Sequence, residues 1–156
     1  MRRSDKKLDD REVVESLLIE EKIGRIGTCG PNGPMIKPVN FLYLNGDIYF
    51  HSSYEGEKME HIKADPRVVF EIERDCRYLP AKNAPCEASF AYSCVIIRGR
   101  AELVEKPEEK IKIFTALMSK YQPEGGYGRF NEKMVKKTAV VKIVVESISG
   151  KTSPVK

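Results

Sequence analysis

The pattern of apolar and polar positions predicts a chain built mainly from β-strands. Along residues 47–53, Ile48 and Phe50 alternate with Tyr49 and His51, so we expect the two pairs on opposite faces of one strand. Similar apolar runs recur along the chain, and several are bounded by turn residues such as Asn-Gly. The predicted strands are residues 22–29, 34–44 with an interruption at Pro38, 48–53, 67–73, 93–105 and 138–151.

Three segments have the spacing of amphipathic helices instead. The first has Asp9 or Asp10 as a candidate N-cap. The apolar stripe expected on the last consists of Ile111, Phe114, Leu117, Met118 and Tyr121. The predicted helices are residues 9–20, 55–64 and 106–121, whereas 75–90 are expected to be irregular and 123–133 a loop or broken helix.

The order of these elements favours an antiparallel sheet. Strands near the N-terminus follow one another through hairpins, whereas a parallel sheet needs a helix between successive strands. We therefore predict a mainly β fold with flanking helices, in which the antiparallel sheet closes into a small barrel. A length of 156 residues suits one domain, which we expect to span residues 1–156.

Composition narrows the functional classes. Charged residues make up 32% of the chain, and no apolar run approaches the ~18 residues of a membrane helix, so we expect no membrane partner. The net charge is only +4 and lysines alternate with acids, so we expect no nucleic-acid partner. The charged N-terminus has no apolar stretch typical of a signal peptide, and we predict a cytoplasmic protein.

The four cysteines predict no metal site. Cys29, Cys76, Cys86 and Cys94 include no Cys-x-x-Cys pair, and no histidine lies at a spacing typical of zinc. In the cytoplasm we expect reduced thiols, with a Cys76–Cys86 redox pair as the minor alternative.

The segment HSSYEGEK, residues 51–58, carries the clearest candidate chemistry. Ser52 and Ser53 are expected at the start of a helix, where unpaired N–H groups and the helix dipole favour an anion. Gly56 allows close approach of the backbone, and Lys58 adds a positive charge within about one turn. Together these residues can hold one phosphate group. The alternative is an ordinary helix with a serine cap and a surface lysine. His61, three residues after Lys58 on the same helix, is expected at the surface or at a dimer contact.

The longer segment DIYFHSSYEGEKMEHIKADPRVVFEIE, residues 47–73, resembles the FMN-binding split-barrel proteins typified by pyridoxamine 5′-phosphate oxidase. The greater likeness is to the branch named for 5-nitroimidazole resistance, the Nim proteins. The resemblance extends over nearly the whole chain and includes the segments MRRSDKKL, KIGRIGTCGPNGPMIKPVNFLYL, YSCVIIRGRAELVE and KTAVVKIVVESISGK. The resemblance implies a split β-barrel of the FMN-binding type and a homodimer that holds the flavin between its subunits.

The same resemblance implies a set of cofactor-binding residues. Residues along the edge of the flavin ring system would be Lys37, Pro38, Val39 and Asn40. Ser52, Ser53 and Lys58 would hold the phosphate, and His51 would lie beside the ring in a catalytic role. Residues approaching the partner's flavin would be Tyr92, Ser93 and Cys94, and the motif that closes the branch would be Ser149, Gly150 and Lys151.

An FMN site implies an oxidoreductase, because the cofactor supplies redox chemistry. The Nim branch suggests a small-molecule substrate, an organic acceptor such as a nitroaromatic. The alternatives are a flavin-binding protein for storage or redox sensing, a binding barrel without cofactor, and haem- or deazaflavin-linked chemistry on the same fold. The chain ends soon after Lys151, without the arginine-rich tail of pyridoxamine 5′-phosphate oxidases, so we do not expect vitamin B6 oxidation.

Overall fold

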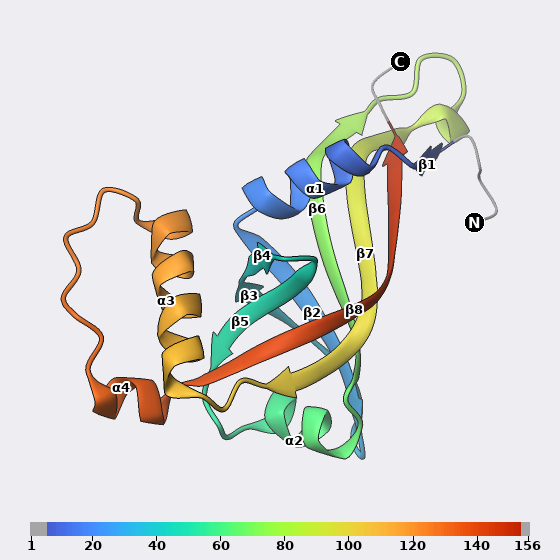
Figure 1. Ribbon diagram of the computed structural model, residues 1–156. Coiled ribbons are helices and arrows are strands. Elements are labelled where there is room, and N and C mark those ends of the chain that lie inside the picture. The colour runs from blue at the N-terminus through green and yellow to red at the C-terminus, as the bar shows by residue number, and fades with distance from the viewer. Residues whose placement is uncertain (1–5, 154–156) are drawn as a thin grey trace.

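The computed structural model describes residues 6–153 (Figure 1). The predictions that involve Met1–Asp5 and Pro154–Lys156, including part of the MRRSDKKL motif and of the domain 1–156, lie outside these residues. The helices are α1 (Arg11–Glu20), α2 (Glu57–Ala64), α3 (Pro107–Tyr121) and α4 (Glu132–Lys137), with a 3₁₀ turn, η2, at Pro85–Glu87. The strands are β1 (Lys7–Leu8), β2 (Ile23–Gly30), β3 (Gly33–Asn40), β4 (Leu42–Leu44), β5 (Asp47–Ser52), β6 (Arg67–Leu79), β7 (Ser89–Leu103) and β8 (Ala139–Ser153).

The strands form one antiparallel sheet, as predicted. Its order is β3-β2-β6-β7-β8-β5-β4, and β1 pairs with the end of β8. The expectation that the sheet closes is wrong, since β3 and β4 are its two edges and no pairing joins them in the described residues. Pro34 and Pro38 both lie in β3 and cannot donate a backbone hydrogen bond, which suits an edge strand. The barrel is therefore split beside β3.

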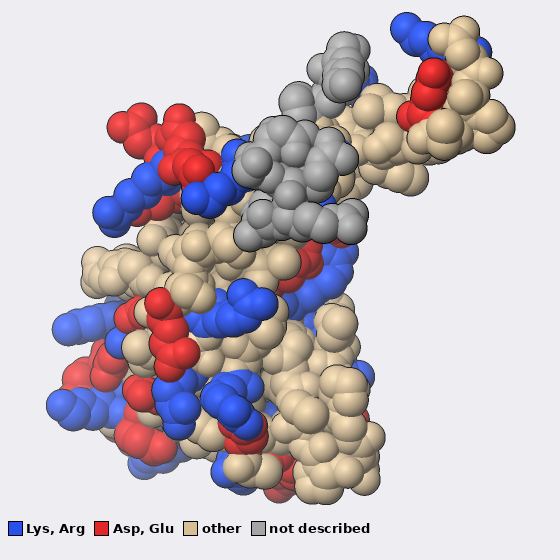
Figure 2. Space-filling view, turned by 90° about the vertical axis from the view of Figure 1, so that its right-hand side faces the viewer, with Lys and Arg blue, Asp and Glu red and all other residues tan. Residues whose placement is uncertain are grey.

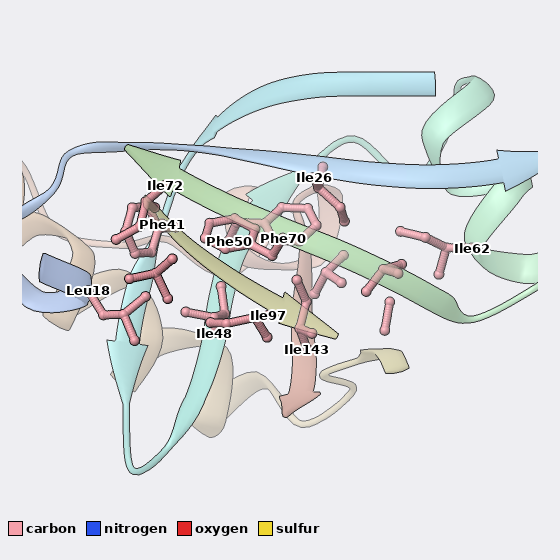
Figure 3. Close-up of a cluster of buried hydrophobic side chains, with 14 of the residues drawn as sticks. Leu18, Ile26, Phe41, Ile48, Phe50, Ile62, Phe70, Ile72, Ile97 and Ile143 are labelled. Carbon is pink, nitrogen blue, oxygen red and sulfur yellow. The ribbon is translucent and has the colours of Figure 1, made fainter. Parts of the chain in front are cut away.

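The curled sheet encloses the main core (Figure 3). Ile48 and Phe50 are fully buried in this core, whereas Tyr49 packs in a second cluster under α3. The predicted alternation along β5 is therefore confirmed. Phe41 and Phe70 meet edge to face with their ring centroids 5.0 Å apart. The break predicted at Pro38 lies instead at Phe41, because this buried ring turns the chain inward between β3 and β4.

The apolar stripe predicted on α3 needs correction. The stripe on α3 includes Lys110 and Ile113, while Ile111 is 40% exposed. The buried positions follow the helical period of 3.6 residues from Lys110, and Ile111 is out of phase with them despite being apolar. On α1, by contrast, the expected N-cap is confirmed, because the Asp10 carboxylate accepts from the N–H groups of Glu12 and Val13.

Both ends of the segment predicted to be irregular, residues 75–90, are strand. β6 continues to Leu79 and β7 begins at Ser89, which leaves only residues 80–88 between them. The register shifts between Arg74 and Arg77, and Asp75 has a positive φ of 59°. This bulge breaks the alternation on which the prediction depended. The two strands form an arm that projects beyond the rest of the molecule (Figures 1 and 2).

No helix within residues 6–153 combines the length and apolarity needed to cross a membrane. The cytoplasmic location remains a prediction. The four cysteines are free thiols, so the minor alternative of a Cys76–Cys86 disulfide is not present in this structure.

Candidate anion and cofactor site

The start of α2 is open. Gly56 is its N-cap with a φ of 103°, a conformation that favours glycine, and no side chain caps the helix. The Ser53 hydroxyl instead accepts a hydrogen bond from the N–H of Glu55, so the alternative of a serine cap is wrong. Helix N–H groups without a capping side chain, together with the helix dipole, form an anion-binding site.

Cationic side chains gather beside this helix start. Lys37 on β3 and Lys58 on α2 are close enough that Lys37 contributes to a lowered Lys58 pKa, after the larger effect of burial. The pKa of His51 on β5 is also lowered, mainly by burial and to a smaller extent by the positive charge of Lys58. Among the residues that the structure describes, no carboxylate forms an ion pair with Lys37 or Lys58. An anion bound near Lys37 and Lys58 would reduce the repulsion between their ammonium groups.

Lys58 is the best-oriented member of this cluster. Its half-buried ammonium lies over the Phe50 ring, 5.1 Å from the centroid. The cation–π contact with this ring restrains the ammonium near the C-terminal end of β5, where the turn to α2 begins. Ser52 and Ser53 precede it on the same turn, as predicted, although neither begins the helix.

A mostly apolar cavity of about 420 Å³ adjoins His51. Asn40, at the end of β3, is a second polar residue in its wall, and α3 and the segment leading to α4 supply the apolar side. The apolar lining includes Phe114, Leu117, Met118, Phe130 and Met134. No lysine, arginine, aspartate or glutamate lines it in the described residues. The sequence pattern did not predict the contribution of Phe130 and Met134, because Phe130 lies within the segment expected to be a loop or broken helix and Met134 comes directly after it.

The predicted residues fall into two groups. Lys37, Pro38, Val39, Asn40, His51, Ser52, Ser53 and Lys58 lie on β3, β5 and the start of α2. Tyr92, Ser93 and Cys94 lie on β7, at the opposite end of the sheet from α2 (Figure 1). Lys151 on β8 pairs with Cys94, and its ammonium is 5.5 Å from the centroid of the Tyr92 ring. One chain therefore does not bring the two groups together.

The second group borders a cavity of its own, with a volume of about 650 Å³. Tyr92 and Ser93 line it together with residues of the arm and the end of β8. Of the predicted closing motif, Gly150 packs on β1, where an added Cβ would lie 2.7 Å from the Leu8 carbonyl oxygen. Its lack of a side chain is therefore explained by packing.

Cys94 is unsuited to nucleophilic chemistry. Burial, followed by the nearby Glu71 carboxylate, raises the pKa of its thiol to about 12. The thiol donates to Glu71 Oε1 at 3.6 Å. A thiol in this environment stays protonated at neutral pH, so Cys94 is a poor nucleophile.

This environment predicts slow alkylation of Cys94. At pH 8, iodoacetamide is expected to modify Cys94 at least about tenfold more slowly than the exposed Cys86, because only the thiolate reacts. Peptide mass spectrometry over a time course measures both rates, and in denaturant the two should converge. Equal rates in the folded protein would contradict the assignment.

His61, expected at the surface or a dimer contact, is buried instead. Its side chain is 2% exposed, and Nδ1 lies 3.1 Å from the Thr28 hydroxyl. The ring occupies the space where a Cβ on Gly30 would be, 2.1 Å from His61 Cδ2. His61 thus joins α2 to β2 and helps fix the helix that carries Lys58.

These features define a class of protein: an antiparallel split barrel with a candidate anion site at a helix start and an adjoining apolar cavity. Residues 10–152 match the family described as pyridoxamine 5′-phosphate oxidase. The chain belongs to this family, and the predicted resemblance is confirmed. No protein with a curated description matches the sequence.

Solved structures with the same fold include three informative examples. A candidate 5-nitroimidazole antibiotic resistance protein from Bacteroides thetaiotaomicron has a TM-score of 0.81 and 24% identity, over 93% of this chain and 85% of the other. A flavocytochrome from Azotobacter vinelandii has a TM-score of 0.84 and 18% identity, over 99% and 72%. An FAD- and haem-binding protein from Mycobacterium smegmatis has a TM-score of 0.84 and 16% identity, over 97% and 76%. At these identities the similarity establishes the split-barrel fold.

Proposed function

We propose that this protein binds FMN, with the phosphate at the start of α2. The observation that carries this proposal is the pair of cationic side chains, Lys37 and Lys58, beside an uncapped helix start, with the imidazole of His51 next to them. A phosphate dianion accepts several hydrogen bonds, and charge-assisted bonds are stronger than neutral ones. Membership of the pyridoxamine 5′-phosphate oxidase family supports a flavin cofactor, as do two similar structures, one named as a flavocytochrome and the other as an FAD- and haem-binding protein. FMN is the choice of flavin that we propose.

The flavin ring system would extend from the phosphate along β3. Pro38 and Val39 offer an edge with few competing backbone donors, and Asn40 and His51 offer polar groups at the apolar cavity. Because the pKa of His51 is lowered, its imidazole is neutral at pH 7 and has one donor and one acceptor nitrogen. His51 can therefore orient a bound ring or a substrate without adding charge.

We also propose that the working unit is a homodimer. The second predicted group, Tyr92, Ser93, Cys94 and Lys151, lies too far along the sheet to serve the same chain's phosphate site (Figure 1). The projecting arm also exposes Tyr78 and Phe90, which meet edge to face with centroids 5.6 Å apart. An exposed aromatic pair is typical of a protein–protein contact. A second copy with the opposite orientation would add these residues to each flavin site.

The proposed activity is reduction of a small organic acceptor. FMN, when bound, would supply the redox chemistry, with electrons from a reduced donor passing to the acceptor. The protein's own part is to hold the phosphate through Lys58, orient the ring near His51 and exclude water with the apolar side chains of α3 and α4. A cavity lined by no permanently charged side chain favours a neutral, planar acceptor, and a nitroaromatic fits this description.

A reoxidation experiment separates this enzyme from a flavin-storage or redox-sensing protein. Protein loaded with FMN is reduced with dithionite and mixed without oxygen with a neutral nitroaromatic, while flavin absorbance is followed by stopped flow. We expect the rate to saturate with acceptor and to exceed that of free reduced FMN by about tenfold or more, because the cavity positions the acceptor. A rate equal to that of free reduced FMN, without saturation, would favour storage or sensing.

A further inference from the structure

A buried lysine lies behind the proposed phosphate site. Lys110, in the first turn of α3, is only 4% exposed. No carboxylate forms an ion pair with it among the residues 6–153. Lysine is almost never fully buried without a partner, because removing its charge from water is costly. A buried ammonium without a carboxylate therefore calls for a compensating group.

The contacts of Lys110 join three segments around the start of α2. Its ammonium donates to the hydroxyl of Tyr54 and, at 3.2 Å, to the carbonyl oxygen of Thr138. It also lies over the Tyr54 ring, 5.0 Å from the centroid. Tyr54 belongs to the turn between β5 and α2, and Thr138 is the last residue before β8. Because Ser52 pairs with Ala139, both contacts of Lys110 are at the end of β5 from which the phosphate-binding turn starts.

These contacts have two physical consequences. The bond to Tyr54 fixes the turn that ends at Gly56, and this turn determines where the open N–H groups of α2 and the Lys58 side chain lie. The two oxygen atoms and the ring face compensate the ammonium only with neutral dipoles. An anion at the adjacent helix start would offset the remaining charge more effectively, because Coulomb interactions are strong where water is excluded.

We propose that Lys110 is a buried positioning residue of the phosphate site and sets the preference of the protein for a phosphorylated flavin. It acts through Tyr54 on the geometry of the turn and through its charge on the bound phosphate. This inference depends on the proposed FMN site and adds a residue of α3 that lay outside the apolar stripe predicted from the sequence. Riboflavin, which has the same ring system without the phosphate, should gain little from Lys110.

The test compares FMN with riboflavin. Dissociation constants of both are measured by flavin fluorescence for the wild type, for Lys110→Met and for Tyr54→Phe. We expect Lys110→Met to weaken FMN binding by about tenfold or more and to change riboflavin binding by less than about twofold. Tyr54→Phe, which keeps the charge and removes one hydrogen bond, should change FMN binding in the same direction by a smaller factor.

Lys112→Met is the matched control, since Lys112 is exposed on the same helix. It should leave both constants unchanged. Equal weakening of FMN and riboflavin by Lys110→Met would indicate a merely structural role and overturn the inference, as would unchanged FMN binding. If Lys110→Met does not fold, the same comparison of FMN with riboflavin is made for Tyr54→Phe. Weakening of FMN binding alone supports the inference, whereas equal weakening of both flavins, or unchanged FMN binding, overturns it. A wild type that binds FMN no better than riboflavin refutes the phosphate site itself, which is a different failure.

Discussion

Replacing Lys58 by alanine is expected to weaken FMN binding by about 10- to 100-fold. A hydrogen bond to a charged group contributes about 1.5–3 kcal/mol, and each ~1.4 kcal/mol changes a dissociation constant tenfold. Lys58 follows the open helix start directly, and Phe50 restrains its ammonium. The lowered pKa of Lys58 means that burial and the charge of Lys37 disfavour its ammonium form in the free protein. A bound phosphate dianion would offset this effect. Fluorescence titration with FMN measures the effect.

The matched control for this variant is Lys63→Ala. Lys63 is exposed on the same helix and is away from its first turn, so its removal changes net charge equally without touching the site. It should alter FMN affinity by less than about twofold, because exposed charges are screened by salt. If the two variants bind FMN equally well, Lys58 does not contact the phosphate.

Replacing Ile143 by alanine is expected to lower the free energy of unfolding by about 2–5 kcal/mol. Ile143 is fully buried in the main core, on a strand paired on both sides, opposite Ile48 of β5 and Ala101 of β7. Shortening this side chain removes its own burial and leaves a cavity, since strands bonded on both sides cannot move inward to fill the gap. Urea unfolding followed by circular dichroism measures the loss.

Ile36→Ala provides the comparison for the same chemical change. Ile36 lies on the edge strand β3 and is 68% exposed, so the expected loss is below about 1 kcal/mol. Similar losses for the two variants would mean that β8 is not the centre of the core described here.

The β-strands were predictable where alternation was regular. Ile48 and Phe50 face one core and Tyr49 faces the other, as their period of two residues requires. The arm was not predictable, because the bulge at Asp75 shifts the alternation and the residues on both sides are largely exposed. Periodicity reports burial of one face, and a strand that projects from the body buries neither face well.

Residue type misled the prediction where tertiary contacts decide burial. Ile111 was placed on the buried stripe of α3 and Lys110 was not, although the helical phase assigns them the other way. His61 was expected outside, yet Thr28 and the missing side chain of Gly30 give it a buried place. In both cases a polar side chain is buried because a partner far along the chain accepts or donates its hydrogen bond.

The candidate site was predictable in part. The association of Lys58 with the start of α2 follows from short-range sequence, but the proximity of Lys37 depends on how β3 packs beside β5. The apolar cavity required α3 and α4, which are distant in sequence from His51. The role of Tyr92, Ser93, Cys94 and Lys151 in a flavin site stays a prediction, since it depends on a second subunit.

The most direct test of the central claim is a titration of the wild-type apoprotein with FMN and, separately, with riboflavin, followed by flavin absorbance and fluorescence. We expect saturable FMN binding near one molecule per chain and an affinity at least about tenfold higher than that for riboflavin, because the cationic helix start recognises the phosphate. Failure to bind FMN, or equal affinity for the two flavins, would contradict the proposed phosphate site and with it the proposed function.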